Sequence, residues 1–310
     1  MDTFTSVLTP GTKQASDILR SFYIMCGVAA FIFAVVAGLV LYATCRFRRR
    51  EGREPKQFVE NVRLEVLWIS IPVLIVTGLF IVAVWIMSLV NPPALGRKPD
   101  LLVVAHQWWW ELHYPQSGVT AANEIHLPVG RRLLLRFESA DVIHTFWVPS
   151  LGQKIDVIPG HPNHLWLTIE RPGTYLGACD SFCGLGHAKM RIRVIAQSPE
   201  DFSAWLGGQK KPASTPSTLQ ASYGAGVFIE KNCVNCHSIA GLMTTGRLAP
   251  DLTHVASRET LAAGTLPNTP ADLSLWLKDP QAVKRGANMP YLGLSGDQIK
   301  YLTAYLGGLK

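Results

Sequence analysis

Soft metal ligands gather in one short stretch in the middle of the chain. The twelve residues from Cys179 to Met190 read CDSFCGLGHAKM and include a second thiol, Cys183, and an imidazole, His187. Two thiolates, an imidazole and a thioether suit copper rather than magnesium or calcium, and a structural zinc site would lack the thioether. Two thiolates can bridge a pair of copper ions and spread one electron over both. Each copper still needs a terminal imidazole, so a second histidine must come from elsewhere in the chain.

A second set of cysteines predicts a covalently attached haem. Cys233, Cys236 and His237 form the C-x-x-C-H pattern, in which the two thiols bond the vinyl carbons and the histidine ligates the iron. The opposite haem face needs another ligand, and Met289 is favoured because it lies on an irregular stretch before the last expected helix. Met243 is the alternative, but only five residues separate it from His237. That separation leaves little chain to pass around the macrocycle.

Composition places these groups in a membrane protein of several domains. The 310 residues suggest two or three folded units, and 48% of them are hydrophobic while only 16% are charged. The net charge of +7 could suggest nucleic-acid binding, but one block of basic residues lies between two apolar runs and therefore indicates membrane topology. No nucleic-acid partner is expected. The block contains Arg46, Arg48, Arg49, Arg50, Arg53, Lys56 and Arg63.

Two apolar runs predict a two-helix transmembrane hairpin within residues 1–98. Residues 21–45 and 66–90 are each long enough to cross a bilayer as a helix. The first run is too long for a typical signal-peptide core and shows no clear cleavage site, so it is expected to be a permanent helix. The basic loop between the runs is expected in the cytoplasm, which places both termini and both soluble domains on the outer face.

Residues 99–206 predict a β-rich domain. Apolar and polar side chains alternate in short runs that are separated by turn signals, for example in 131–138 and 190–196. This alternation is typical of half-buried strands and predicts an antiparallel β-sandwich or barrel.

A linker and a helical domain complete the chain. Residues 207–217 are rich in Gly, Pro, Ser and Thr and are expected to form the linker. Residues 218–310 form the second soluble domain, with a helical pattern around 219–232 and a last helix after Ser295. Ser295 and Gln298 have the spacing of a capping box.

Three segments together resemble subunit II of the haem–copper cytochrome c oxidases. They are the context of His144 in DVIHTFWVP, residues 150–160 (SLGQKIDVIPG), and the cysteine loop. The resemblance extends from the first apolar run to about Leu206, and it implies a cupredoxin-like Greek-key β-barrel for the domain that carries the loop. The C-terminal domain resembles an all-α class I cytochrome c, in which an early attachment motif is followed by a late Met-Pro loop.

The resemblance also implies a complete ligand set for two copper ions, the mixed-valence centre called CuA. In the family the equivalents of Cys179 and Cys183 bridge both metals. The equivalents of His144 and Met190 complete one copper, and those of His187 and the backbone carbonyl of Ser181 complete the other. In the cytochrome domain, the carbonyl of the residue matching Pro250 orients the histidine that ligates the haem.

Ser181 departs from the family pattern. Many members carry glutamate at this position, and its carboxylate helps to hold a magnesium ion against subunit I. Serine can lend its carbonyl to copper but cannot supply that carboxylate. A magnesium site is therefore uncertain in this chain.

The resemblance suggests roles for two further residues, Trp108 and Glu65. Each residue also has a simpler explanation. Trp108, in an aromatic cluster expected on the first strand after the membrane, matches the tryptophan where electrons enter from cytochrome c. The cluster could equally be amphipathic rings at the membrane–water interface, or Trp108 could face the fused haem domain. Glu65 matches the mouth of a proton path into subunit I, although the helix dipole alone favours a carboxylate there.

The expected function is electron input to a membrane-bound cytochrome c oxidase. Electrons would come from a cytochrome c or another periplasmic donor and pass through haem c and the two-copper centre to subunit I, where oxygen reduction is coupled to proton translocation. No histidine lies in residues 1–98, so the oxygen-reducing site is expected in another chain. Partners would be subunit I, subunit III and lipid of the bacterial inner membrane. The alternatives are electron input to a nitric oxide or nitrous oxide reductase and, in another class, a membrane-anchored copper chaperone.

Overall fold

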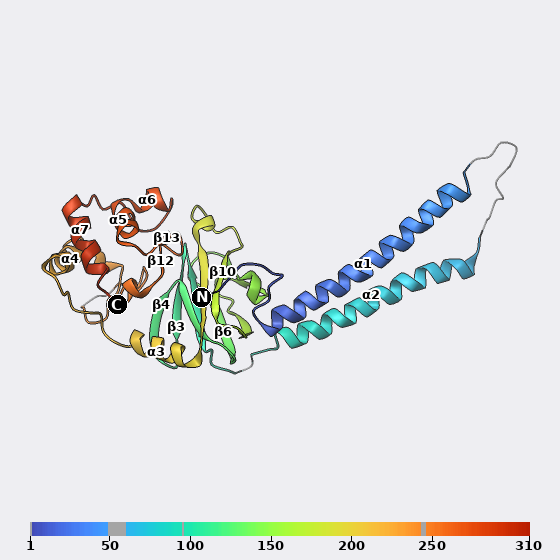
Figure 1. The fold of residues 1–310 in the computed structure, drawn as a ribbon, viewed down its shortest axis with the longest axis horizontal. Coiled ribbons are helices and arrows are strands. Elements are labelled where there is room, and N and C mark those ends of the chain that lie inside the picture. The colour runs from blue at the N-terminus through green and yellow to red at the C-terminus, as the bar shows by residue number, and fades with distance from the viewer. Residues whose placement is uncertain (1, 49–59, 95, 243–245) are drawn as a thin grey trace. The chain divides into compact units, whose positions relative to one another are not determined.

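The computed structural model describes residues 2–48, 60–94, 96–242 and 246–310 (Figure 1). The chain divides into two compact units. Ser16–Pro92 form one unit, and the segments on either side of it, Met1–Ala15 and Pro93–Lys310, form the other.

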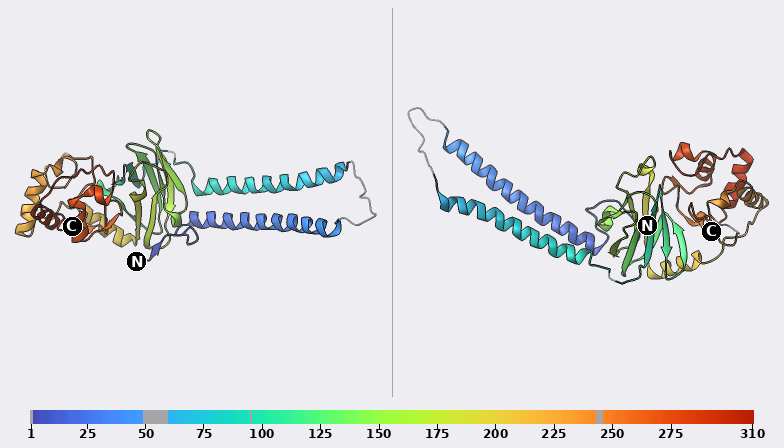
Figure 2. Two further views of the ribbon diagram at one scale, coloured as in Figure 1. Left: turned by 90° about the horizontal axis from the view of Figure 1, so that it is seen from above. Right: turned by 180° about the vertical axis from the view of Figure 1, so that it is seen from behind.

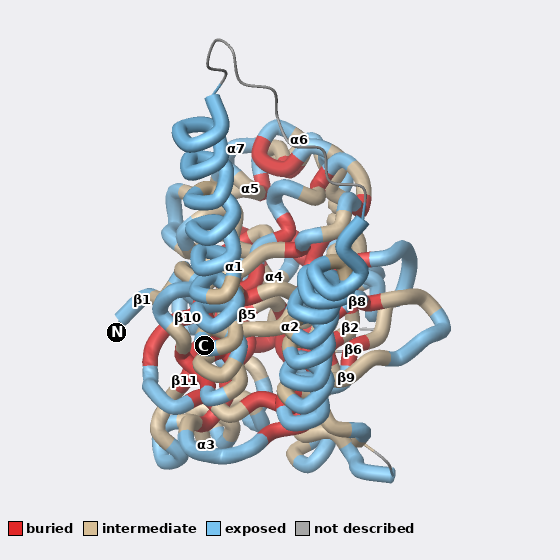
Figure 3. Tube along the Cα trace, turned by 90° about the vertical axis from the view of Figure 1, so that its right-hand side faces the viewer, coloured by how far each residue is buried: buried red, intermediate tan, exposed pale blue. Residues whose placement is uncertain are grey.

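The first unit consists of two long apolar helices. Helix α1 is Lys13–Arg46 and helix α2 is Val62–Val90, so they enclose the predicted spans 21–45 and 66–90. Both are long and apolar enough to cross a membrane, and their side chains are exposed along almost their whole length (Figure 3). Of the predicted basic block, Arg49, Arg50, Arg53 and Lys56 lie outside the described residues.

The β-rich part of the second unit contains two sheets, as the alternating pattern predicted. One sheet has the order β4-β3-β2-β6-β9, and the other has the order β5-β11-β10-β7-β8 with β1 beside β10. The strands are β1 (Thr3–Phe4), β2 (Leu101–His106), β3 (Trp109–Tyr114), β4 (Val119–Ala122), β5 (Glu124–Pro128), β6 (Arg132–Ser139), β7 (His144–Trp147), β8 (Lys154–Val157), β9 (Asn163–Thr168), β10 (Gly173–Cys179) and β11 (Arg191–Gln197).

The pairing of these strands is mixed, whereas the sequence predicted an antiparallel arrangement. β2 pairs with β6, β5 with β11 and β1 with β10 in parallel, and the other strand pairs are antiparallel. Parallel neighbours arise because the chain crosses from one sheet to the other and returns, as in a Greek key. The inward faces of both sheets share one apolar core, whose largest fully buried rings are Trp110, Phe137, Phe146 and Tyr175.

The N-terminal segment belongs to this β-rich domain. Thr3 and Phe4 pair with Thr174 and Tyr175 of β10. The amide of Gly11 also donates to the carbonyl of Ser150 at 2.7 Å. The residues before α1 and those after α2 therefore lie in one folded body.

The helical domain follows helix α3 (Pro199–Gln209), so the first three residues of the predicted linker 207–217 are helical. The remaining elements are α4 (Leu219–Glu230), β12 (Thr260–Leu261), β13 (Leu266–Pro267), α5 (Pro270–Lys278), α6 (Pro280–Val283) and α7 (Gly296–Leu306). These elements lie beside the two sheets, within the same compact unit (Figure 2). The predicted capping box is present, with both the Ser295 and the Gln298 side chains accepting backbone hydrogen bonds.

Candidate metal and haem site

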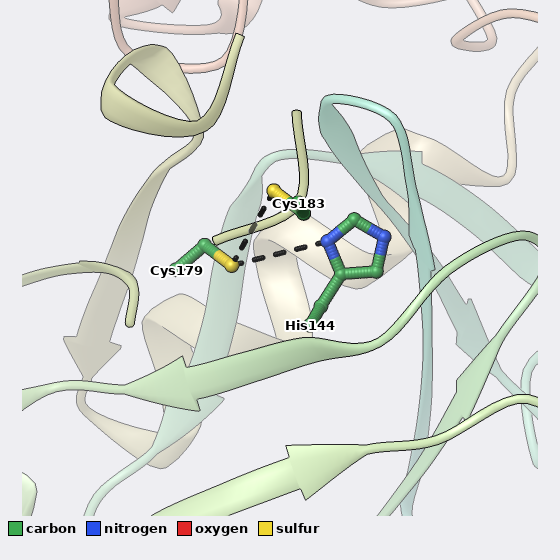
Figure 4. Close-up of side chains that lie close together, drawn as sticks. All are labelled: His144, Cys179 and Cys183. Carbon is green, nitrogen blue, oxygen red and sulfur yellow. Dashed lines mark hydrogen bonds between the residues drawn. The ribbon is translucent and has the colours of Figure 1, made fainter. Parts of the chain in front are cut away.

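The predicted thiols and imidazoles converge at the end of β10. The Sγ atoms of Cys179 and Cys183 are 3.8 Å apart, and Nδ1 of His144 is 3.8 Å from Sγ of Cys179 (Figure 4). On the other side, Nδ1 of His187 is 3.6 Å from Sγ of Cys183. His144, Cys179 and Cys183 are all buried, and their ligand atoms lie within 4.8 Å of one another. One imidazole therefore faces each sulfur of the pair.

The remaining two predicted copper ligands belong to the same loop. The carbonyl oxygen of Ser181 is 3.3 Å from Sγ of Cys179. Met190 is fully buried in the apolar core that also contains both cysteines. The donor set of thiols, imidazoles, a carbonyl and a thioether fits copper, because soft sulfur and imidazole ligands bind that metal in preference to hard cations.

The protonation of the two thiols differs. Burial raises the pKa of Cys179, but the hydrogen bonds from His144, Thr145 and Ser181 outweigh it and lower that pKa to about 7. Burial and the neighbouring charge of Cys179 raise the pKa of Cys183 to about 12. Without a metal, one thiol is thus readily ionised and the second is held neutral, since like charges this close cannot both be accommodated.

Asp141 orients His144 and was not predicted from the sequence. Its Oδ1 atom is 2.8 Å from Nε2 of His144, and its Oδ2 atom accepts a 2.6 Å hydrogen bond from the backbone amide of Gln107. A carboxylate on the far ring nitrogen directs Nδ1 toward the sulfur, as is usual for metal-bound histidines. The signal available in the sequence was the Asp three residues before the histidine.

Trp108 lies against the cysteine loop. Its Nε1 atom donates a 2.9 Å hydrogen bond to the carbonyl of Cys183, and Nε2 of Gln107 donates to the same oxygen at 2.7 Å. The ring approaches so closely that a Cβ on Gly186 would lie 2.4 Å from its Cδ2 atom. Glycine is therefore required at that point of the loop.

The aromatic cluster differs from the prediction in one respect. Trp108 lies in the turn between β2 and β3, and not on the first strand. Trp108, Trp109 and Trp110 are all buried in the second unit. Trp108 and Trp110 belong to the core of the β-rich domain, whereas Trp109 packs with Ala122 and with Ala263 of the helical domain. Lys284 of the helical domain donates to the carbonyl of Trp108, which supports the alternative in which Trp108 faces the fused domain.

Ser181 makes a contact that a glutamate would not. Its Oγ atom is 2.5 Å from Oγ1 of Thr145, which in turn donates a 2.7 Å hydrogen bond to Asp156. The hydroxyl is thereby engaged within this chain.

The haem motif lies directly after α4. Cys233–Asn235 form a short 3-10 turn, which places Cys233 and Cys236 on one stretch of chain with His237 next to them. Nδ1 of His237 lies 2.7 Å from the carbonyl of Pro250, as the resemblance implied. This contact uses one ring nitrogen and leaves Nε2 for iron. Burial lowers the pKa of His237, which favours the neutral imidazole that binds a metal.

Met289 lies in the helical domain, partly buried against its apolar core. Its carbonyl accepts a 2.9 Å hydrogen bond from Nε2 of Gln281, which also donates to the carbonyl of Ala287 at 2.7 Å. The Met289 stretch is thus held by α6. The competing candidate, Met243, lies outside the described residues. Glu65 is in the first turn of α2, where both the dipole and the proton-path interpretations place it.

Two membrane-length helices, a β-rich domain with clustered thiols and imidazoles, and a helical domain with a C-x-x-C-H motif define a membrane-anchored electron-transfer protein. Family comparisons make the class specific. Residues 9–89 match the transmembrane domain of cytochrome c oxidase subunit II, residues 117–197 match its periplasmic domain, and residues 221–310 match cytochrome c.

Curated relatives extend this match over nearly the whole chain. Cytochrome c oxidase subunit 2 of Alkalihalophilus pseudofirmus is 34% identical over 98% of this chain and 91% of its own length. Its counterpart in Bacillus subtilis is 32% identical over 96% of this chain and 91% of its own length. The crystal structure of the periplasmic domain of subunit II from Bradyrhizobium japonicum is 30% identical, covers 37% of this chain and 96% of that domain, and gives a TM-score of 0.35.

The chain belongs to the cytochrome c oxidase subunit II family, in a form that carries a C-terminal cytochrome c domain. Its cupredoxin-like domain and its cytochrome domain are those that the sequence predicted. Membership of this family implies copper in the first domain and haem c in the second. It favours the oxidase over both alternatives, the nitrogen-oxide reductases and the copper chaperone.

Proposed function

We propose that this chain takes electrons from a donor on the outer face of a bacterial inner membrane and delivers them to the haem–copper site of subunit I, which reduces oxygen to water with proton translocation. The haem would be held by Cys233, Cys236, His237 and Met289. Two coppers would be held by His144, Cys179, Ser181, Cys183, His187 and Met190. Both groups supply one-electron redox chemistry when bound.

The observation that carries this proposal is the symmetry of the sulfur pair. Two thiols lie 3.8 Å apart, His144 faces one of them and His187 faces the other. A mononuclear copper site needs one thiolate, and a structural zinc site has no use for this arrangement of one imidazole on each sulfur. Two metals that share both thiolates, each with its own imidazole, account for all four side chains.

The membrane orientation is supported by the N-terminal segment. Because β1 pairs with β10, the residues before α1 and those after α2 must lie on one side of any membrane that both helices cross. The residues between the helices then lie on the other side, where the positive-inside rule places Arg46, Arg48 and Arg63. The copper and haem domains would thus face the periplasm.

The proposed partners follow from this position. Subunit I would receive the electrons, subunit III would complete the complex, and a cytochrome c or another periplasmic protein would be the donor. Glu65, at the cytoplasmic start of α2, would lie where protons enter subunit I. Trp108 would lie on the path of the electrons to the copper.

Replacement of one bridging thiol tests the proposal. In the purified oxidase, Cys183→Ser should abolish the mixed-valence electron paramagnetic resonance signal of the copper pair, because one of the two bridges is lost. The haem c absorption spectrum should be unchanged, since the haem motif is in the other domain.

Cys45→Ser is the matched control, because Cys45 is a free and exposed thiol near the end of α1. This variant should keep both the paired-copper signal and the haem spectrum. A mixed-valence signal that survives Cys183→Ser would overturn the bridging assignment.

A further inference from the structure

The copper and cytochrome domains lie in the same compact unit, and each contributes one buried ionisable side chain that contacts the other. Glu124 of β5 is 3% exposed and Lys284, at the end of α6, is 4% exposed. Domains joined by a Pro/Ser/Thr-rich linker are ordinarily expected to move relative to each other. Buried charges at the contact are therefore informative, because they are costly unless their partners are fixed.

The Glu124 carboxylate binds backbone of the cytochrome domain. Both oxygens accept from the amide of Glu259 at 3.0 Å, and Oε1 also accepts from the amide of Thr260 at 2.8 Å and from its Oγ1 at 2.7 Å. The carboxylate thus has the hydrogen bonds that a buried anion needs.

Lys284 makes a contact in the opposite direction, from the cytochrome domain to the backbone of the copper domain. Its Nζ atom donates to the carbonyl of Trp108 at 2.6 Å and to the carbonyl of Ala262 at 3.0 Å. One acceptor belongs to the copper domain and the other to the cytochrome domain, so the side-chain amine of Lys284 joins the two. Burial lowers the pKa of Lys284 to about 7, and in either protonation state the amine can donate to these carbonyls. Gly286 follows two residues later, and a Cβ on it would lie 2.8 Å from Cβ of Leu185 in the cysteine loop.

These contacts bring the Met289 stretch to the copper loop. Nδ2 of Asn288 donates a 3.0 Å hydrogen bond to the carbonyl of Gln107. The side chain of Gln107 donates in turn to the carbonyl of Cys183 at 2.7 Å. A short series of covalent and hydrogen bonds therefore joins the residue before the proposed iron ligand to a proposed copper ligand.

We propose that Glu124 and Lys284 form a reciprocal latch that holds the cytochrome domain permanently over Gln107 and Trp108, so that the Asn288–Gln107–Cys183 contact connects the two redox sites. This inference rests on the proposed function. With both groups bound, the latch would serve the transfer of one electron from haem c, which would be oxidised, to the copper pair, which would be reduced, with no bond broken and no proton transferred. A second, external cytochrome cannot occupy the surface that the chain's own domain covers.

The test compares Glu124→Gln, Lys284→Met and the double variant in the purified oxidase. Amide hydrogen exchange at Glu259 and Thr260 should rise about tenfold in Glu124→Gln, because the neutral amide oxygen accepts more weakly than the charged carboxylate. After rapid photoreduction of the haem, electron transfer to copper should slow in proportion to the fraction of domains that remain docked. The haem absorption spectrum and the copper resonance signal should be unchanged in every variant.

Two control variants test whether the effects are specific to the latch, and Asn288→Leu tests the connection between the two redox sites separately. Glu138→Gln alters a half-exposed carboxylate of the copper domain, and Lys300→Met alters an exposed ammonium group of the cytochrome domain; neither should change exchange or transfer. Asn288→Leu should slow the transfer while leaving exchange at Glu259 and Thr260 as in the parent. If exchange is unaffected by both latch variants, the latch is wrong. If exchange rises but transfer keeps its rate, or if Asn288→Leu transfers normally, the proposed connection is wrong.

Failure of the proposed function would look different. In that case the parent protein itself would lack the paired-copper or haem signal, whereas hydrogen exchange would still report whether Glu124 and Lys284 hold the domains together.

Discussion

The residues around the sulfur pair are fixed by hydrogen bonds that do not involve a metal. Asp141 binds both the His144 ring and the Gln107 amide, and the Cys183 carbonyl accepts from both Gln107 and Trp108. His144, through Asp141, and the Cys183 carbonyl are therefore both held by the turn that contains Gln107 and Trp108. Such support keeps a metal site rigid and reduces the rearrangement that accompanies electron transfer.

Asp141→Asn tests this support. The amide can keep a hydrogen bond to His144 but cannot supply the negative charge that favours the required ring tautomer. Copper affinity should fall by roughly 10- to 100-fold, as for other partners of metal-bound histidines. Competition with a copper chelator measures the affinity. Glu138→Gln, at a half-exposed carboxylate paired with Arg136, should leave it unchanged, and equal affinities in the two variants would refute a role for Asp141.

Met289→His tests the second haem ligand. The haem should remain attached, because both thiols are untouched, but its reduction potential should fall, because a Met/His pair gives a higher potential than two histidines. A spectroelectrochemical titration measures the shift. An unchanged potential would show that Met289 does not bind the iron.

Residue types and spacing were enough to predict the haem attachment motif and the metal loop, because those ligands are close together in the sequence. Asp141 was missed for the opposite reason. Its role depends on a contact between the turn after β2, which contains Gln107, and the segment just before β7, which contains Asp141. No local sequence pattern predicts that contact. Trp108 was placed on a strand because its neighbours are aromatic, whereas it turns inward between two strands.

At the scale of elements, the helices were more predictable than the strand pairings. The last helix was expected from its capping box and its apolar face, both of which are local features. The parallel pairs β2–β6 and β5–β11 were not expected, since alternation shows that a strand has one buried face but not which neighbour it selects.

Helices α4 and α7 offer a matched pair of substitutions. A Cβ on Gly224 would lie 2.1 Å from the carbonyl oxygen of Tyr301, whereas a Cβ on Gly226 would meet nothing within 4 Å. Gly224→Ala should destabilise the cytochrome domain by about 1–3 kcal/mol through overpacking. Gly226→Ala, on the exposed face, should stabilise it by roughly 0.5–1 kcal/mol through helix propensity.

Thermal unfolding followed at the haem absorption bands gives both free energies, with the parent as reference. Equal effects of the two substitutions would show that the close crossing of α4 and α7 does not require glycine at position 224.

At the scale of the whole molecule, length and composition predicted the domains and the membrane helices. The helices are uncharged apolar runs, and the linker between the soluble domains is rich in Gly, Pro, Ser and Thr. The contact between the copper and cytochrome domains could not be predicted. Glu124, Lys284 and Asn288 look like ordinary surface residues in the sequence, and only the folded surfaces show that they are buried or paired across the domains.

The orientation of the chain gives a prediction at this scale. In a Cys26→Ala, Cys45→Ala background, a thiol at Thr5→Cys should react with a membrane-impermeant maleimide added to spheroplasts, because the N-terminal segment folds with the β-rich domain that we propose to lie in the periplasm. A thiol at Glu60→Cys should react only after the membrane is permeabilised. Labelling of both positions in intact spheroplasts would contradict the two-span topology.

The pairing of β1 with β10 also dictates an order of biogenesis. Strand β1 can pair with β10 only after Thr174 and Tyr175 have been synthesised. In the proposed topology, the N-terminal segment must therefore be translocated before the barrel is closed, and both helices must already be inserted. Loading of copper at the loop that follows β10 would then be a late event of assembly. A bulky fusion that retained the tail in the cytoplasm would leave β10 with an open edge and the nascent subunit exposed to aggregation.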